Sequence, residues 1–166
     1  MKAIVAVDLN WGIGYKGNLL QWIPGDMKFF KRMTLGKVVI MGRETFESLP
    51  GKKPLKERMN IVLSKNKGFT NENVIICRSV EELLQLLVNY SEEDIFVIGG
   101  ESIYAQLLPF CSEAYVTKIR NRYVADKYFI NIDEIEQWES VTESEPQSYD
   151  NIEYCFVRYV NNKCNK

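Results

Sequence analysis

The stretch that decides the fold is IFVIGGESIYAQLLP, residues 95–109. Its first part, IFVIGG (95–100), is an apolar run ending in two glycines, which is typical of a buried strand. ESIYAQLLP (101–109) follows directly and is predicted to be a helix that stops at its proline. A strand that passes through a glycine turn into a helix is the repeating unit of α/β folds, so we expect a largely parallel sheet.

The same alternation extends to both sides of this stretch. Further strands are predicted at 2–7, 37–41, 59–64 and 73–77, and further helices at 23–34, 42–51 and 79–90. Ser79 and Glu82 form a capping box for the helix at 79–90. Strands at 113–121, 137–143 and 153–160 close the chain and predict an antiparallel edge. We therefore predict one domain, residues 1–166, built as a three-layer α/β sandwich with a mixed, mostly parallel sheet flanked by helices.

The composition excludes several classes of function. The chain of 166 residues carries 21 basic and 22 acidic residues, so it has no excess charge with which to hold nucleic acid or an anionic membrane. The apolar start, MKAIVAV, is too short for a signal peptide, and no run approaches the length of a membrane span. We expect a cytoplasmic protein whose four cysteines are reduced and incidental.

The chain contains no histidine. This excludes Ser-His-Asp and Cys-His catalysis and the commonest zinc sites, and we expect no metal site. If the protein is an enzyme, its proton chemistry must come from Asp, Glu, Lys, Tyr, water or the substrate itself.

GIGYKG, residues 12–17, matches the glycine fingerprint of dinucleotide-binding folds. A true fingerprint turns directly from a strand into a helix, because the helix N-terminus holds the pyrophosphate. Here three residues separate Gly12 from the end of the strand at Asp8, and Pro24 and Gly25 interrupt the segment that follows. We therefore interpret this segment as a glycine-rich loop over a strand end, of the kind that often serves as a lid.

Two other strand ends meet the requirement for phosphate binding. The first passes from Gly42 into a helix beginning near Arg43, and the second passes from Gly99 and Gly100 into a helix beginning near Glu101. Each directs free N–H groups towards the carboxyl edge of the sheet, although a single such turn can be an ordinary connection. An arginine at the first helical position suits a phosphate monoester, which favours NADP over NAD. Further donors could come from Ser64, Lys65 and Arg78, or these could be ordinary surface residues.

Asp26 stands near the start of the helix at 23–34 and has two interpretations. It could be the helix N-cap, for which Asp is a preferred residue. Alternatively, it shares a helical face with Phe30 and lies close to Met27, Trp22 and Ile23, so its carboxylate could bind paired N–H donors of a flat heterocycle. Burial there would raise its pKa and suit it to proton delivery.

Taken together, the motifs of the chain resemble those of dihydrofolate reductase from end to end, and bacterial members most closely. The matching segments are WGIGYKGNLLQW (11–22), PGD (24–26), FFKRMT (29–34), VVIMGRETFESLP (38–50), NIVLS (60–64), IFVIGGESIYAQLLP (95–109), AYVTKI (114–119) and YCFVRY (154–159). The resemblance implies an eight-stranded mixed sheet and the NADPH-dependent reduction of 7,8-dihydrofolate to tetrahydrofolate by a monomer.

The resemblance also implies a role for individual residues. Asp26 matches the family's active-site acid and Thr117 the threonine that bonds to it, and Leu20 and Trp22 on the lid are counted with them as catalytic. Arg58 matches the arginine that binds the α-carboxylate of the glutamate tail, and Arg43 the one that binds the 2′-phosphate. The implied substrate-binding residues are Val5, Ala6, Asp26, Met27, Phe30, Leu49, Leu55, Arg58, Ile98 and Thr117. The implied cofactor-binding residues are Ala6, Ile13, Gly14, Asn18, Gly42, Arg43, Thr45, Leu63, Ser64, Lys65, Arg78, Gly99, Gly100, Glu101, Ser102, Ile103 and Tyr104. Gly99 and Gly100 match a pair joined by a cis peptide.

The sequence departs from the family pattern in a few places. Gln21 stands where the family commonly has proline, DKYFI (126–130) replaces the usual Asp-Thr-x-Phe-Pro, and Glu44 stands where some relatives have a basic or polar residue. Two alternative functions remain: a reductase of riboflavin synthesis with the same architecture, and a pterin- or nucleotide-binding protein without turnover. Asp26 and Arg58 argue against the first, and the intact Gly-Gly pair argues against the second.

Overall fold

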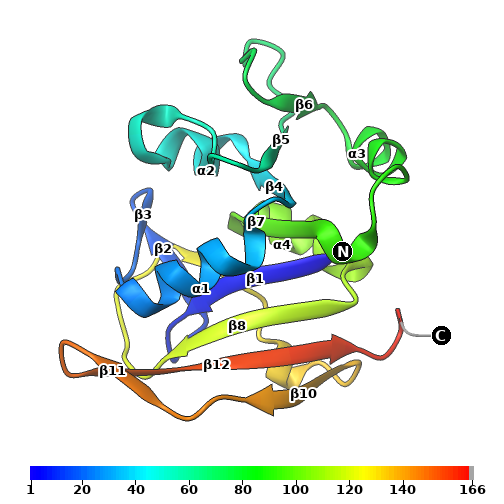
Figure 1. Ribbon diagram of the computed structural model, residues 1–166. Helices are drawn as coiled ribbons and strands as arrows, with labels where there is room; N and C mark the ends of the chain where they lie inside the picture. The colour runs from blue at the N-terminus through cyan, green and yellow to red at the C-terminus, as the bar shows by residue number, and fades with distance from the viewer. Residues whose placement is uncertain (165–166) are drawn as a thin grey trace.

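The computed structural model describes residues 1–164 and is built on one large mixed sheet (Figure 1). Its strands follow the order β10-β12-β8-β1-β7-β4-β5-β6, and a short strand, β11, pairs with β12. The strands are β1 (Lys2–Val7), β4 (Val38–Gly42), β5 (Met59–Leu63), β6 (Ile75–Cys77), β7 (Ile95–Gly99), β8 (Glu113–Ile119), β10 (Trp138–Glu143), β11 (Gln147–Tyr149) and β12 (Ile152–Asn161). The last two residues of the predicted domain, 165–166, lie outside the described part.

The predicted mixture of parallel and antiparallel strands is confirmed. Every pairing from β8 through β1, β7, β4 and β5 to β6 is parallel. The C-terminal edge, where β12 pairs with β8, β10 and β11, is antiparallel. All strands of the parallel part therefore end at the same edge of the sheet, which is where a ligand site is expected in such folds.

Helices cover both faces of the sheet. They are α1 (Pro24–Thr34), α2 (Arg43–Ser48), α3 (Val80–Leu87) and α4 (Glu101–Leu107), with short 3-10 turns at Pro50–Lys52, Glu92–Asp94, Leu108–Phe110 and Ile132–Glu134. Alternate residues of β4 show the two faces: Val38 and Ile40 pack in the core with α3 and α4, whereas Val39 and Met41 pack with Phe46 of α2. Ala6 of β1 points away from the core of Val5 and Val7 and packs with Ile23, the residue before α1, so α1 lies on the same face as α2 and the predicted three layers are confirmed.

The segment interpreted as a lid contains structure that the sequence did not predict. Residues Gly12–Tyr15 form β2 and Asn18–Leu19 form β3, and these pair with each other and with β9 (Lys127–Tyr128) in a separate small sheet. The glycines of β2 have low strand propensity, so the pattern gave no strand signal. The pairing holds the lid against DKYFI, more than 100 residues away in the sequence.

The capping box predicted at α3 is half present. The Ser79 hydroxyl accepts a hydrogen bond from the Glu82 N–H at 3.1 Å, as expected. The Glu82 carboxylate, however, accepts from the N–H of Arg78 rather than from that of Ser79. The reciprocal bond is therefore displaced by one residue towards β6, which ends at Cys77.

Candidate functional site

Asp26 lies in the first turn of α1 and is directed at the sheet. The helix N-cap is Ile23, so the interpretation of Asp26 as the cap is wrong. Its Oδ1 accepts a hydrogen bond of 2.6 Å from the hydroxyl of Thr117, a buried residue of β8. The opposite oxygen, Oδ2, has no hydrogen-bond partner among residues 1–164, yet no fully buried side-chain oxygen in that range lacks one. It follows that Oδ2 is accessible and free to accept hydrogen bonds from a ligand.

The surroundings of Asp26 change its acidity. The residue is 9% exposed, and its burial raises the pKa of the carboxyl group above the ordinary value, while the hydrogen bond from Thr117 partly offsets this rise. The two effects have opposite signs because burial penalises the charged form and a donated hydrogen bond stabilises it. A single carboxylate with a raised pKa in a pocket is a candidate for binding and protonating a ligand.

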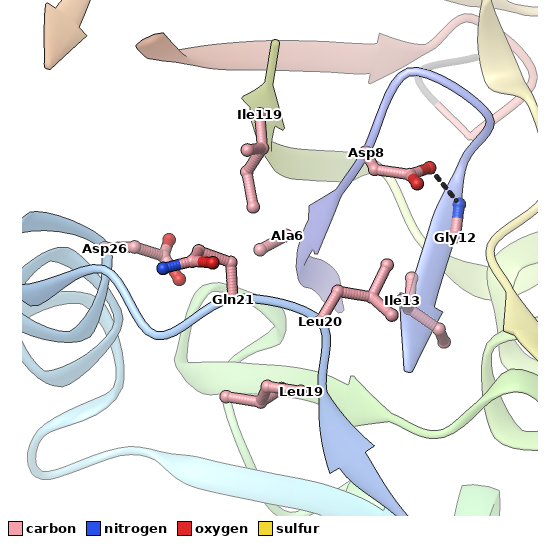
Figure 2. A pocket seen from close by; sticks show the side chains of 9 residues that line it. All are labelled: Ala6, Asp8, Gly12, Ile13, Leu19, Leu20, Gln21, Asp26 and Ile119. Carbon is pink, nitrogen blue, oxygen red and sulfur yellow. Dashed lines mark hydrogen bonds between the residues drawn. The ribbon is translucent and has the colours of Figure 1, made fainter. Parts of the chain in front are cut away.

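A narrow pocket joins Asp26 to the lid. Figure 2 shows its lining: Ala6, Asp8, Gly12, Ile13, Leu19, Leu20, Gln21, Asp26 and Ile119. The end of β1, the end of β8 and the start of α1 supply its base, and the β2–β3 hairpin with the residues after it supplies the cover. The predicted lid residues Leu20 and Ile13 therefore share a pocket with Asp26, whereas Trp22 is 57% exposed and does not line it.

Asp8 is a second carboxylate of this pocket, but its oxygens are already engaged. Oδ1 accepts from the N–H groups of Asn10 and Gly12 at 2.8 Å, and Oδ2 accepts from the N–H of Tyr123 at 2.9 Å. Asp8 therefore ties the lid to the loop after β8 and has a structural role. The sequence did not indicate it, because one of its partners is 115 residues away.

Gln21, which stands where proline was expected, is held by a side chain that is distant in the sequence. Its Oε1 accepts from the hydroxyl of Tyr123 at 3.3 Å. In addition, the Asp126 carboxylate accepts from the N–H of Lys16 at 3.0 Å. In this chain, polar contacts with residues 123–126 fasten the lid at the turn between β2 and β3 and again at Gln21, just before α1.

Two glycine turns form a backbone-lined surface beside the pocket. They follow β4 and β7, which are neighbours with Met41 opposite Gly99. A Cβ atom on Gly42 would lie 2.9 Å from Cγ1 of Ile103, and one on Gly100 would lie 3.2 Å from Oγ1 of Thr45, so the two turns are packed closely. Gly99 and Gly100 are joined by a cis peptide bond.

Neither helix that follows these turns has a side-chain cap, so backbone N–H groups remain available at the starts of α2 and α4. The surface thus fits the phosphates of a dinucleotide. Glycines leave the backbone open to close approach, and an arginine stands at the start of α2.

The charged residues predicted for the cofactor site have partners of their own. Arg43 forms an ion pair with Glu47 at 2.7 Å and approaches Glu44 at 3.9 Å. The guanidinium of Arg78 donates to the carbonyl groups of Ser64, Asn66 and Phe69, which shapes the loop after β5. Arg43 is one-third exposed, so a phosphate could compete with the glutamates for its donors.

The remaining cofactor candidates are divided between this edge of the large sheet and the small sheet of the lid. Lys65 and Asn18 are exposed, the Leu63 and Ile103 side chains are buried in the core, and Glu101 accepts from the N–H of Tyr128. The hydroxyl of Tyr104 donates to the carbonyl of Ile4 at 2.7 Å, which ties α4 to β1 near the pocket. Gly14 and Ser102 lie on β2 and α4.

The predicted substrate walls lie mainly on the α1/α2 face. Half-buried there are Met27, Phe30, Leu49, Leu55 and Ile98, and Ala6 belongs to the adjoining cluster of Ile23, Ile119 and Tyr154. Val5 differs from the expectation, because its side chain packs in the core of the opposite face and only its backbone faces the pocket side.

Arg58 reaches the end of α1. Its Nη1 donates to the Thr34 hydroxyl at 3.1 Å, and partial burial lowers the pKa of the guanidinium, which nonetheless stays charged. It also lines an open groove at the starts of β5 and β6, together with Asn60 and Glu72. This places a fixed positive charge at the far end of the face that carries Asp26.

None of the helices in residues 1–164 combines the length and the apolar character that crossing a membrane requires. Within the same residues, no group of three His, Cys, Asp or Glu side chains is placed to hold a metal ion.

Comparison with known proteins points to one family. A family model described as dihydrofolate reductase matches residues 1–161. The dihydrofolate reductase of Bacillus subtilis is 35% identical over 98% of this chain and 95% of that protein. A structure described as dihydrofolate reductase from Enterococcus faecalis complexed with NADP(H) and RAB-propyl superposes with a TM-score of 0.86 and 34% identity, covering 97% of this chain and 95% of that one.

Longer proteins match as well. A bifunctional dihydrofolate reductase-thymidylate synthase of Daucus carota is 39% identical over 96% of this chain. The chain spans only about a third, 33%, of that relative's length.

Proposed function

The chain belongs to the dihydrofolate reductase family, and we propose that it reduces 7,8-dihydrofolate to 5,6,7,8-tetrahydrofolate with NADPH. The observation that carries the proposal is the Asp26–Thr117 pair, a carboxylate held at 2.6 Å by a buried hydroxyl with its second oxygen accessible. A riboflavin-pathway reductase would not need this acid or Arg58. A binding protein without turnover would not need a covered pocket that adjoins a dinucleotide surface.

The substrate is oriented by charges at two ends of one face. Asp26 accepts hydrogen bonds from the exocyclic amino group and the adjacent ring N–H of the pterin, which present two parallel donors to the two carboxylate oxygens. Arg58 binds the α-carboxylate of the glutamate tail. Between them, the half-buried side chains of Met27, Phe30 and Leu49 contact the flat rings and the linking benzoyl group.

Gly42, Arg43, Gly99 and Gly100 would hold NADPH along the sheet edge, with the phosphates against the open N–H groups. When bound there, the cofactor supplies a hydride from nicotinamide C4 to C6 of the pterin. Leu20 covers the meeting point and excludes bulk water from it. The neighbouring pterin N5 takes a proton, for which we propose water as the donor, while Asp26 fixes the ring and its protonation state.

The test is direct. Purified protein mixed with NADPH should lose the absorbance of the reduced nicotinamide when dihydrofolate is added, and should keep it when dihydrofolate is omitted. A protein that binds both ligands without oxidising NADPH would refute the proposed activity and favour the binding-protein alternative.

We further propose that the protein acts as a single domain and a monomer in the cytoplasm, and that it does not bind nucleic acid. The near balance of 21 basic and 22 acidic residues supports the last point. Light scattering after size exclusion tests the monomer, for which a mass close to 19.3 kDa is expected.

A further inference from the structure

The residue before Asp26 is unusually close to the sheet. Gly25 is the second residue of α1, where it offers no side chain to pack and gives the unfolded chain more conformational freedom than any other residue would. A Cβ atom on Gly25 would overlap the hydroxyl oxygen of Tyr154 and lie 3.2 Å from Cζ of its ring. The backbone of α1 therefore rests directly on a tyrosine hydroxyl from β12, an approach that only glycine allows.

Tyr154 cannot easily move out of the way. It is 4% exposed and packs in one cluster with Ile23 and Ile119. Its hydroxyl donates to Oε1 of Gln147 on β11 at 3.2 Å, so the β11–β12 hairpin holds the hydroxyl in place. Burial and the negative charge of Asp26 both raise the pKa of this tyrosine, so the hydroxyl keeps its proton.

The register of the sheet connects this contact to the acid. Tyr154 pairs with Ile119 on β8, two residues from Thr117, and side chains two residues apart on a strand point to the same face. Consecutive residues of α1 thus meet diagonally neighbouring positions on one face of the sheet: Gly25 meets Tyr154, and Asp26 meets Thr117. The first contact limits how near α1 can come to the sheet, and the second depends on that distance.

We propose that Tyr154 is a positioning residue for the active-site acid. Its hydroxyl contacts Gly25 and so sets the distance between the first turn of α1 and the sheet, on which the 2.6 Å hydrogen bond between Thr117 and Asp26 depends. This inference rests on the proposed function only for its kinetic consequence. A merely structural role for Tyr154 in the core would change stability without acting on Asp26 in particular.

The experiment is a cycle of G25A, Y154F and G25A/Y154F, with Y149F and G25A/Y149F as matched controls, because Tyr149 lies on the same hairpin and is 39% exposed. In G25A the new methyl group pushes α1 away, and a misplacement of about 1 Å at a reacting group lowers kcat/KM by as much as roughly 100-fold. The pH profile of kcat/KM should shift towards higher pH, because Asp26 loses the hydrogen bond that lowers its pKa. NADPH affinity should change less than twofold.

Removing the hydroxyl should undo this damage. G25A/Y154F should return to within about threefold of Y154F in kcat/KM and regain its pH profile, whereas G25A/Y149F should stay as impaired as G25A. If G25A does not fold, a folded double variant with a normal pH profile supports the proposal, and an unfolded one overturns it.

Crystal structures give a readout that needs no turnover, so this inference and the proposed function can fail separately. The distance between Thr117 Oγ1 and the Asp26 carboxylate should exceed hydrogen-bonding range in G25A and recover in the double variant. A hydrogen bond unchanged in G25A, or a double variant as impaired as G25A, would overturn the proposal.

Discussion

Replacing Asp26 with asparagine is expected to remove most of the activity while leaving the site assembled. The carboxylate offers two oxygens to the pterin, and each charge-assisted hydrogen bond contributes roughly 1.5–3 kcal/mol. Asparagine keeps one oxygen, which Thr117 already engages, and turns an N–H group towards the donors of the ring. One bond is lost outright and the other is weakened because the amide oxygen is neutral, so the cost is about 1.5–6 kcal/mol, which corresponds to roughly 10-fold to 10,000-fold in kcat/KM at neutral pH.

The assay is steady-state oxidation of NADPH by D26N and wild-type protein across pH, with NADPH affinity measured separately by fluorescence. The affinity for NADPH should be nearly kept, because the glycine turns proposed to hold NADPH follow β4 and β7, whereas Asp26 lies on α1. Equal losses in NADPH affinity and in turnover would refute the reasoning, since they would mean that Asp26 merely supports the fold.

The same variant makes a prediction about stability. Burial raises the folded-state pKa of Asp26 above the unfolded-state value, so the folded protein binds a proton more tightly and loses stability as the pH rises through the window between the two values. In D26N the side chain is neutral at every pH, so the folded protein does not bear the cost of ionising a buried carboxyl group. Its melting temperature should equal or exceed that of the wild type at neutral pH, and the difference should shrink as the pH falls below the ordinary carboxyl range.

Three further substitutions test the surroundings of the acid and the cofactor surface. T117V removes the donor to Asp26, which should raise the pKa of that carboxyl further and move the pH profile of kcat/KM upward; an unmoved profile would count against the pair. R43A should lower kcat/KM for NADPH about 10-fold to 100-fold and leave kcat/KM for NADH nearly unchanged. An unchanged ratio of the two kcat/KM values would exclude a contact between Arg43 and the 2′-phosphate. G42A would bring a methyl group against Ile103, so it should lower the free energy of unfolding in urea by roughly 1–3 kcal/mol and weaken NADPH binding. An unchanged free energy of unfolding and an unchanged NADPH affinity would show that the turn accommodates a Cβ atom.

The regular elements of the fold were predictable because their signals are local. The buried strand at Ile95–Gly99 and the helix at Glu101–Leu107 each have an uninterrupted pattern and a clear stop, and both were predicted within one or two residues. The small sheet of β2, β3 and β9 was not predictable in this way. Its pairing joins Gly12 to Tyr128, and neither segment has the alternation that identifies a strand.

The site was predictable to the extent that motifs carried it. Asp26 was singled out from its place near the start of a helix and Thr117 was named from the resemblance, and the structure places the two in contact. Asp8, Tyr123 and Tyr154 were missed, because each acts through a contact with a residue distant in the sequence, and a lone polar residue at the end of a strand has no pattern of its own.

The central claim is that the carboxylate at the start of α1 holds the pterin, and a crystal structure with folate and NADP⁺ bound tests it most directly. The account predicts both Asp26 oxygens at about 3 Å from the amino and ring nitrogens of the pterin, with Leu20 closed over the nicotinamide. An Asp26 carboxylate directed away from the pteridine, with the ring held by other groups, would contradict it.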